Sequence, residues 1–352
     1  MKNKKIAIIG HFGGNKQFFD GQTVKTIALY EELKRTFNYS PYKVDTYYKK
    51  CNPLKLLWQT LACLFTCDDI FVLLSSGGMK IYFPLLFLAS KIKKIRIYHD
   101  VIGGNLDQII QKHPKFCKYL NSFTVNWVET NSLKVKLEKL GVYNAEMLPN
   151  FKNLNAIPMS SISPYNSQDG CYSFCTFSRV LAEKGITDAI NSILAVNLKY
   201  QKNIAKLHIY GPIDESYREE FEKLVACHKQ CISYKGIVNS NDSVEVLKNY
   251  FAMLFPTKWN GEGFPGTVLD CYASGLPVIA SDWNSNSEII NHMKTGLIYP
   301  SKDFANLTDA IEWSIVHHQK IDSMRVSCRS EYEKYTPEQI ISIIKTKLCK
   351  NK

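Results

Sequence analysis

Short apolar runs alternate with amphipathic stretches along nearly the whole chain, and this alternation constrains the fold more than any other feature. The predicted strands of the first half lie at residues 6–9, 70–74, 95–98 and 125–129. The predicted helices between them lie at residues 23–37, 82–89 and 132–140. The same order resumes at Phe174 and continues to Ser281. Strands separated by helices form parallel sheets, so the chain is predicted to be an α/β protein.

Between Pro149 and Gly170 the apolar periodicity stops, and Pro, Ser and Asn dominate. This composition is typical of a linker. A chain of 352 residues is long for one domain. We therefore expect two Rossmann-like domains, at residues 1–152 and 153–336, with ligands bound beyond the carboxyl ends of their strands.

The net charge of +12 is concentrated in the first half of the chain. Residues 1–150 carry 22 Lys and Arg against 11 Asp and Glu, whereas residues 151–352 carry 22 against 21. Such an asymmetry favours an anionic partner, either a membrane surface or a nucleic acid, although a solvated basic surface explains it equally well. Leu54 to Phe65 and Ile81 to Ala89 are amphipathic, and the second stretch precedes Lys91, Lys93 and Lys94. They fit an anionic bilayer or, alternatively, core helices with solvated ends.

The eleven cysteines do not form metal-binding pairs. Cys63 and Cys67 are four residues apart, as are two further pairs, and this is not the spacing of C-x-x-C sites. We expect free thiols in a reducing cytoplasm and no metal site. No apolar stretch reaches the roughly 20 residues of a spanning helix, and no secretion signal is expected before the run Ile6 to Ile9.

The strongest local signal is a Gly-rich loop that enters a helix within residues 258–281. Backbone N–H groups near Gly266, Thr267 and Val268 would point beyond the start of this helix, where they form an anion site. Glu262 and Asp270 add acceptors suited to sugar hydroxyls. A purely structural loop is the alternative.

This segment resembles the retaining glycosyltransferases of family 4, which have the double-Rossmann fold called GT-B. The matches are Glu262-Gly263-Phe264 and the run from Ala273 to Ala280. The resemblance implies that Glu262 contacts the donor sugar and that Asp270 contacts the ribose. The family has Glu at the second position, and Asp is shorter by about 1.5 Å, so we expect a looser ribose contact. The C-terminal helix, residues 337–352, is expected to cross back to the N-terminal domain.

Further matches to the family complete the expected site. Arg179 and Lys184, in the segment from Phe177 to Gly185, would neutralise the departing diphosphate. His99 would reach the donor sugar from the N-terminal domain, and Leu148 to Phe151 resembles the domain junction. The expected catalytic residues are His99, Arg179, Lys184 and Glu262. The expected donor-binding residues are Gly13, Gly14, Gly211, Val238, Gly263, Phe264, Pro265, Gly266, Thr267, Val268 and Asp270.

The resemblance implies transfer of a hexose from a nucleotide sugar, expected to be a UDP-sugar, with retained configuration and without a metal, a cofactor or a dedicated general base. The basic first half favours a polyprenyl-diphosphate-linked glycan acceptor at the cytoplasmic face of a membrane, in bacterial capsule, exopolysaccharide or lipopolysaccharide assembly. The alternatives are a sugar-nucleotide 2-epimerase or a catalytically silent scaffold on the same fold. A nucleic-acid-binding protein is disfavoured, because the sequence has no recognised nucleic-acid-binding module. The sequence does not predict the oligomeric state.

Overall fold

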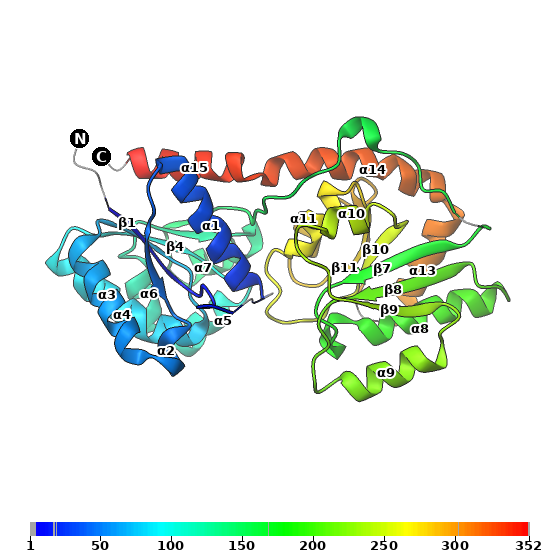
Figure 1. Cartoon of the computed structure of the whole chain (residues 1–352), viewed down its shortest axis with the longest axis horizontal. Helices are drawn as coiled ribbons and strands as arrows, with labels where there is room; N and C mark the ends of the chain where they lie inside the picture. The colour runs from blue at the N-terminus through cyan, green and yellow to red at the C-terminus, as the bar shows by residue number, and fades with distance from the viewer. Residues whose placement is uncertain (1–4, 17, 19, 168, 302, 351–352) are drawn as a thin grey trace. The chain divides into compact units, whose positions relative to one another are not determined.

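The computed structural model of the chain describes residues 5–16, 18, 20–167, 169–301 and 303–350. The outer ends of the predicted domains, residues 1–4 and 351–352, lie outside this range. The chain divides into an N-terminal unit (residues 1–153, 261–264 and 336–352) and a C-terminal unit (residues 154–260 and 265–335), drawn in Figure 1. Residues 261–264 are expected in the second domain, whereas their contacts place them in the N-terminal unit.

The described part of the N-terminal unit contains a six-stranded sheet in the order β2-β1-β3-β4-β5-β6. All neighbouring strands pair in parallel. The strands are β1 (Ile6–Gly10), β2 (Tyr42–Asp45), β3 (Asp69–Val72), β4 (Arg96–Asp100), β5 (Val125–Val128) and β6 (Ala145–Met147). The helices of this unit are α1 (Gly21–Phe37), α2 (Tyr48–Cys51), α3 (Pro53–Thr66), α4 (Ser76–Ile92), α5 (Leu106–Lys112), α6 (Lys115–Leu120), α7 (Asn131–Lys139) and α15 (Pro337–Lys350).

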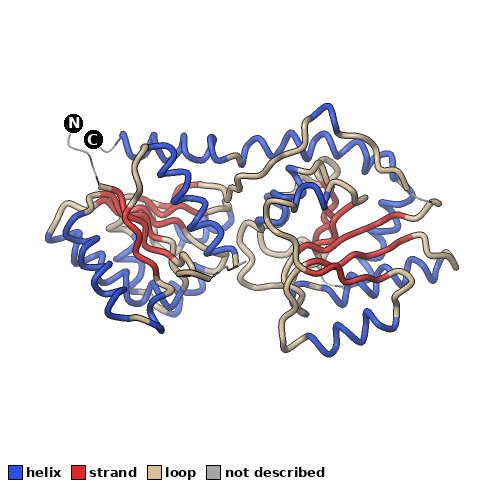
Figure 2. The backbone as a smooth tube through the Cα atoms, viewed as in Figure 1, coloured by secondary structure: helices blue, strands red, loops and turns tan. Residues whose placement is uncertain are grey.

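Helices cover both faces of this sheet, because successive strand residues point to opposite sides. Ile6 and Ile8 face one apolar cluster, and Ala7 and Ile9 face the other. The first cluster also contains side chains of α1 and α15, and the second contains side chains of α3 to α7. Figure 2 shows the strands of this unit with helices around them. Fully burying one Ile or Leu stabilises a fold by about 1.5–3 kcal/mol, so these two clusters hold the unit together.

The described part of the C-terminal unit repeats the plan with a parallel sheet in the order β12-β11-β10-β7-β8-β9. Its strands are β7 (Tyr172–Phe177), β8 (Ala205–Tyr210), β9 (Ile232–Gly236), β10 (Ala252–Phe255), β11 (Val278–Ser281) and β12 (Gly296–Tyr299). Its α-helices are α8 (Ile186–Lys199), α9 (Arg218–Cys227), α10 (Ser243–Leu247), α11 (Gly266–Ala273), α12 (Asn286–Ile289), α13 (Phe304–Val316) and α14 (His318–Tyr332). Short 3-10 helices lie at η1 (Met159–Ser161), η2 (Ala182–Lys184) and η3 (Glu333–Tyr335).

The two helix-covered parallel sheets confirm the predicted α/β class, but several elements differ from the sequence analysis. The structure adds strands β2, β6 and β12 and helices α2, α5, α6, α12 and α14, which no strong pattern predicted. The helix expected at residues 82–89 extends over Ser76–Ile92 and keeps Pro84 inside it. Within the described residues, no helix is both long and apolar enough to cross a lipid bilayer.

Candidate functional site

Four neighbouring strands of the C-terminal unit end at the same edge of its sheet, which we call the donor edge. Strand β7 lies between β10 and β8, and β9 follows β8. Arg179 follows β7, Gly211 follows β8, and Val238 lies in the loop after β9. Because parallel strands share one carboxyl edge, these expected residues gather along it, as ligand sites of open parallel sheets do.

The two expected cations of the donor edge lie beside aromatic rings. The guanidinium carbon of exposed Arg179 is 5.3 Å from the ring centroid of Trp259, in the loop after β10. The amine of Lys184 is 5.8 Å from the ring centroid of Phe255, at the end of β10. Cation–π contacts of this kind limit the positions that a long side chain samples, so both charges are held near the ends of β7 and β10.

Two glycines permit the close backbone approach that this edge requires. A Cβ atom at Gly211 would lie 1.8 Å from the carbonyl oxygen of Ser178, and the φ of Gly211 is 127°. A Cβ atom at Gly185, directly after Lys184, would lie 2.2 Å from the carbonyl oxygen of Pro256. Any other residue would push apart the loops that carry Arg179 and Lys184.

Helix α11 begins at the donor edge after Pro265. Thr267 Oγ1 donates a hydrogen bond of 2.7 Å to the carbonyl oxygen of Phe177, which ties the first turn of α11 to the end of β7. The N–H groups of a first helical turn lack intrahelical acceptors and carry the positive end of the helix dipole. The backbone of Gly266 and Thr267 thus presents donors for an anion, while the Thr267 hydroxyl holds α11 against β7. The Val268 N–H, expected to join them, instead donates to the carbonyl oxygen of Pro265 over 3.0 Å, and its side chain is buried.

The second acid of the expected motif has a protein partner. Asp270 is 1% exposed, and its Oδ1 accepts a hydrogen bond of 2.7 Å from Ser243 Oγ at the start of α10. Such a bond to a carboxylate fixes its orientation. Ser243 is a contributor that the sequence analysis missed, because a serine at the start of a short helix carries no specific signal.

The loop of Glu262 is held by backbone hydrogen bonds within the N-terminal unit. The Phe264 N–H donates to Glu129 Oε2 over 3.0 Å, and Asn150 Nδ2 donates to the Phe264 carbonyl oxygen over 3.1 Å. Glu262 is 9% exposed. Since the chain passes from this loop straight into Pro265 and α11, the two bonds fix one end of the expected motif.

Gly104 and Gly263 allow this loop to pack directly on the backbone. A Cβ atom at Gly104 would lie 2.3 Å from the carbonyl oxygen of Glu262, and one at Gly263 would lie 2.9 Å from Glu129 Oε2. Gly263 is expected in the donor site, and in the structure it belongs to the N-terminal unit, where it packs against Glu129 and Gly103. Close packing without side chains explains why glycine occupies both positions.

A buried ion triad supports Glu129. Lys25 Nζ lies 2.6 Å from Asp100 Oδ1 and 2.8 Å from Glu129 Oε1, and all three side chains are buried. Burial alone would lower the pKa of Lys25, but the carboxylates of Asp100 and Glu129 outweigh burial and hold it above its ordinary value. Burial raises the pKa of Asp100 to about 6, against the opposing effect of Lys25. We call these three residues the Lys25 triad.

His99 lies in the core rather than at a surface. It is 0% exposed within β4, and its ring stands edge-on to Phe83 with centroids 5.1 Å apart. Nδ1 is 3.0 Å from Asn126 Oδ1. Burial, opposed by the Asn126 hydrogen bond and assisted by the charge of Lys25, lowers the pKa of His99 to about 4. The expectation that His99 reaches a bound sugar is not met in this structure, because strand alternation turns its side chain toward α4.

The loop that carries Gly13 and Gly14 is folded around Asp45 at the end of β2. The N–H groups of Phe12 and Gly14 donate to the two carboxylate oxygens of Asp45, each over 2.9 Å. Gly13 and Gly14 have φ values of 84° and 59°, in the left-handed region that favours glycine. This loop therefore has a fixed shape that depends on Asp45, a residue absent from the sequence analysis.

Residues 172–316 match the family model described as glycosyl transferases group 1. Two curated proteins are similar. One is the D-rhamnosyltransferase WbpZ of Pseudomonas aeruginosa, 28% identical over 35% of this chain and 32% of that protein. The other is an uncharacterised 41.2 kDa protein in the cps region of Klebsiella pneumoniae, 23% identical over 69% of this chain and 62% of that protein. The chain thus spans less than two thirds of either relative.

Solved structures share the fold over the whole chain. Sucrose-phosphate synthase from Thermosynechococcus elongatus superposes with a TM-score of 0.77 at 13% identity, covering 99% of this chain and all of that one. HepE from Anabaena, in complex with UDP, gives 0.72 at 11% identity, with coverage of 98% and 100%. The lipopolysaccharide outer core galactosyltransferase WaaB gives 0.69 at 16% identity, with coverage of 99% and 100%. The two-sheet plan predicted from the sequence is confirmed by these neighbours.

Proposed function

We propose that the chain is a retaining glycosyltransferase that moves a hexose from a UDP-sugar to a hydroxyl of a lipid-linked glycan. The donor edge carries this proposal, because Arg179, Lys184 and the first turn of α11 gather there within the segment that matches the glycosyltransferase family. The UDP bound to the structural neighbour HepE supports a uridine donor. The names of the relatives from the cps region and of WaaB support a role in bacterial surface polysaccharide assembly.

The proposed chemistry is stabilisation of a departing diphosphate. Negative charge grows on the diphosphate as the bond to the sugar breaks, and two cations with preorganised N–H groups lower the energy of that state. Arg179 and Lys184 take the part that a divalent metal plays in other transferases, and Glu262 binds the sugar hydroxyls. Asp270, oriented by Ser243, binds the ribose. The departing phosphate assists deprotonation of the acceptor, so the proposal assigns no general base, and His99 supports β4 from the core.

A thermal-shift panel with UDP-, GDP-, ADP- and CMP-sugars tests the proposal. A ligand that binds only the folded state raises the melting temperature as its concentration exceeds Kd. We expect the UDP-sugars to give the largest rise, and we expect the rise to persist in EDTA. No rise with any nucleotide sugar would refute the proposal. Isomerisation of the sugar nucleotide without an acceptor would identify an epimerase instead.

The proposed place of action is the inner face of the cell membrane, with the acceptor presented on a polyprenyl diphosphate. The excess of lysine in the first half of the chain supports an anionic surface as partner. Incubation of membranes with labelled donor, followed by extraction into organic solvent, tests this acceptor. Label that stays wholly in the aqueous phase would count against a lipid carrier.

A further inference from the structure

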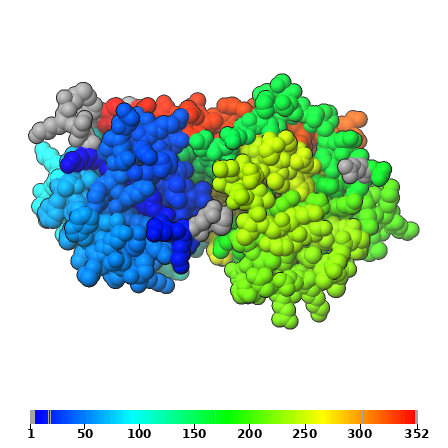
Figure 3. Space-filling model, in the orientation of Figure 1, coloured from blue at the N-terminus to red at the C-terminus, as the bar shows by residue number. Residues whose placement is uncertain are grey.

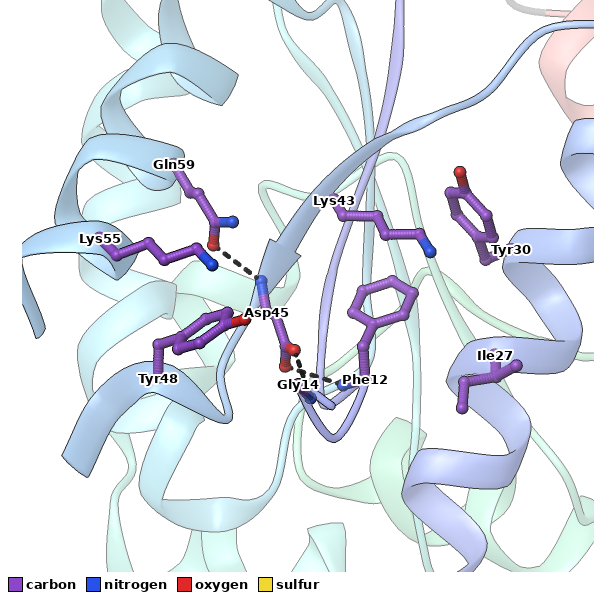
Figure 4. Close-up of a pocket in the computed structure, with 9 residues that line it drawn as sticks. All are labelled: Phe12, Gly14, Ile27, Tyr30, Lys43, Asp45, Tyr48, Lys55 and Gln59. Carbon is purple, nitrogen blue, oxygen red and sulfur yellow. Dashed lines mark hydrogen bonds between the residues drawn. The ribbon is translucent and has the colours of Figure 1, made fainter. Parts of the chain in front are cut away.

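A cavity of about 270 Å³ lies in the N-terminal unit at the carboxyl ends of β1 and β2 (Figure 4). It is lined by Phe12, Gly14, Ile27, Tyr30, Lys43, Asp45, Tyr48, Lys55 and Gln59. The carboxyl edge is where open parallel sheets bind their ligands. We call this cavity the β2 pocket. No residue assigned above to the donor lines it except Gly14, so it is available to a different ligand.

The one acid of the β2 pocket is already compensated by the backbone. Asp45 is 5% exposed, and its carboxylate accepts hydrogen bonds of 2.9 Å from the N–H groups of Phe12, Gly14 and Tyr47. Figure 4 shows this carboxylate turned toward the loop of Phe12 and Gly14. Three N–H donors offset much of one negative charge, so Asp45 mainly fixes the shape of the pocket. Its lysines then make the pocket favourable for an anionic ligand.

Two exposed lysines stand on opposite sides of Asp45 (Figure 4). The Lys43 amine is 3.8 Å from the ring centroid of Tyr30, and the Lys55 amine is 3.8 Å from that of Tyr48. Among the described residues, neither amine has a carboxylate within ion-pair distance. Two ammonium groups held over rings at the mouth of a small cavity are suited to a phosphate or diphosphate.

Helix α3, which contributes Lys55 and Gln59, carries an apolar face that no described part of the protein covers. Its exposed side chains are Leu54 (79%), Leu57 (54%), Trp58 (67%), Leu61 (44%) and Phe65 (79%). They recur at helical spacing, so they form one stripe. The neighbouring α4, joined by a hydrogen bond between Thr60 and Tyr82, adds Ile81, Leu88 and Ile92, all more than half exposed. We call these eight side chains the α3–α4 face.

The charges around the α3–α4 face are mostly positive, and the nearby Asp68 is paired with Lys93 over 3.7 Å. Residues 46–67 and 75–99 contain no Asp or Glu. Their lysines are Lys49, Lys50, Lys55, Lys80, Lys91, Lys93 and Lys94. Segment 46–66 lies at the surface of the N-terminal unit in the space-filling view (Figure 3). Apolar and aromatic side chains surrounded by lysines are complementary to an anionic bilayer, and each basic residue near such a surface strengthens binding.

We propose that the β2 pocket binds the phosphate-bearing head of a lipid while the α3–α4 face rests in the anionic bilayer that supplies it. The geometry joins the two, because Lys55 on α3 belongs to the pocket and the flanking Leu54 and Trp58 belong to the face. This inference rests on the proposed function, in which that lipid carries the glycan acceptor, and it adds the site where the acceptor enters.

The membrane arm of the test needs no sugar donor. Wild-type protein is mixed with vesicles of phosphatidylcholine, with or without phosphatidylglycerol, and bound protein is separated by flotation. Leu54→Glu is compared with Leu198→Glu on α8, because both leucines are 79% exposed. Glutamate in the first turn of α3 favours the helix, so the variant should fold. We expect Leu54→Glu to weaken binding to the anionic vesicles about tenfold and Leu198→Glu to leave it unchanged.

The pocket arm uses farnesyl diphosphate as a soluble lipid diphosphate, titrated by calorimetry in the presence of UDP. We expect Lys43→Ala and Lys55→Ala each to weaken its binding about tenfold. Lys229→Ala, an exposed lysine of the C-terminal unit, serves as the matched control. Inorganic diphosphate alone should bind more weakly than farnesyl diphosphate, since it lacks the apolar chain.

Three results would overturn the inference. The first is equal vesicle binding by Leu54→Glu and wild type. The second is farnesyl diphosphate binding that is unchanged in both Lys43→Ala and Lys55→Ala. The third is a wild type that forms dimers in light scattering and does not bind vesicles, while Leu54→Glu is monomeric; the face would then be an interface between two copies. Failure of UDP-sugars to bind, with both arms positive, would refute the proposed function and leave the lipid site standing.

Discussion

The two units use the same parallel sheet for different purposes. At the donor edge of the C-terminal unit, Arg179, Gly211 and the start of α11 lie next to strand ends, and the Arg179 side chain is exposed. In the N-terminal unit, the charged groups are buried. The Lys25 triad holds the loop of Glu262 through the hydrogen bond from the Phe264 N–H to Glu129. In the proposed function, the exposed charges bind the ligand directly, whereas the buried charges hold the loop of Glu262.

This difference predicts that changes in the N-terminal unit cost folding free energy and that changes at the donor edge cost turnover. If variants of the Lys25 triad leave the free energy of unfolding unchanged, the loop of Glu262 does not depend on the triad. If they lower it, the triad holds that loop in place.

The largest effect is expected from Lys25→Met. Removing the amine leaves two buried carboxylates without a counter-charge, and breaking a buried pair in this way costs about 3–5 kcal/mol. Chemical denaturation should show this loss in the free energy of unfolding. Lys34→Met, an exposed lysine on the same helix, should change it by less than about 0.5 kcal/mol. The double variant Lys25→Met/Glu129→Gln should recover part of the loss, and no recovery would exclude the triad as the cause.

The next effect belongs to Arg179→Ala. Removing one preorganised group that stabilises charge in the transition state lowers turnover by about 100- to 1000-fold. Steady-state kinetics should show the loss mainly in kcat, with an unchanged melting temperature. Arg218→Ala, on the outer helix α9, is the matched control and should retain wild-type turnover. Equal activity of the two variants would remove Arg179 from the site.

A titration distinguishes the buried histidine from an exposed one. The pKa of His99 is about 4 in the folded chain against an ordinary 6.5, so the unfolded chain takes up the proton first as the pH falls. Stability from neutral His99 is therefore present above pH 6.5 and lost as the pH falls toward 4. The excess stability of wild type over His99→Asn should shrink by about 3 kcal/mol across this window. A stability difference that does not change between pH 7 and pH 4 would show that the pKa of His99 is the same in the folded and the unfolded chain.

Asp100 acts in the opposite direction across an overlapping window. Burial raises its pKa from 3.8 to about 6. The contribution of protonated Asp100 to folding stability is therefore present at low pH and is lost as the pH rises through 6. Asp100 is present in both proteins, which is why the comparison with His99→Asn isolates the histidine.

The smallest effect is expected from Thr267→Val. The substitution keeps the shape of the side chain and removes its hydrogen bond to the Phe177 carbonyl, which costs about 1 kcal/mol. Because this bond ties α11 to β7, the KM for the donor should rise slightly as well. Thr308→Val, whose hydroxyl bonds within the exposed α13, should leave the KM unchanged.

The donor edge could be predicted from sequence because its signals are local. Arg179 and Lys184 lie within nine residues of Phe177, and Glu262 and Asp270 flank one loop, so a strand followed by a motif places each residue. Most strands of both sheets could also be predicted, since buried parallel strands are continuous apolar runs, but β2, β6 and β12 could not.

The support of the N-terminal unit could not be predicted in this way. Lys25 is 75 residues from Asp100 and 104 from Glu129 in the sequence. Taken alone, each of the three looks like an ordinary charged surface residue. The strand β2 was missed because Tyr42 and Lys43 break its apolar run. The burial of His99 was missed because a histidine before an aspartate at a strand end also fits an exposed site, and only its partners Asn126 and Phe83 decide between the two.

The helix α15 has a consequence for synthesis of the chain. Its Ile340, Ile341, Ile344 and Leu348 complete the cluster that covers Ile8, Phe71, Tyr98 and Trp127 of the first sheet. A ribosome makes that sheet and α1 well before α15, so the part of this face that α1 does not cover stays open to water until α15 has been made. The first unit to emerge is thus the last to be completed. A protein chain truncated before residue 336 would keep the sheet of the C-terminal unit intact. Its N-terminal sheet, without α15, would be exposed to chaperones and proteases.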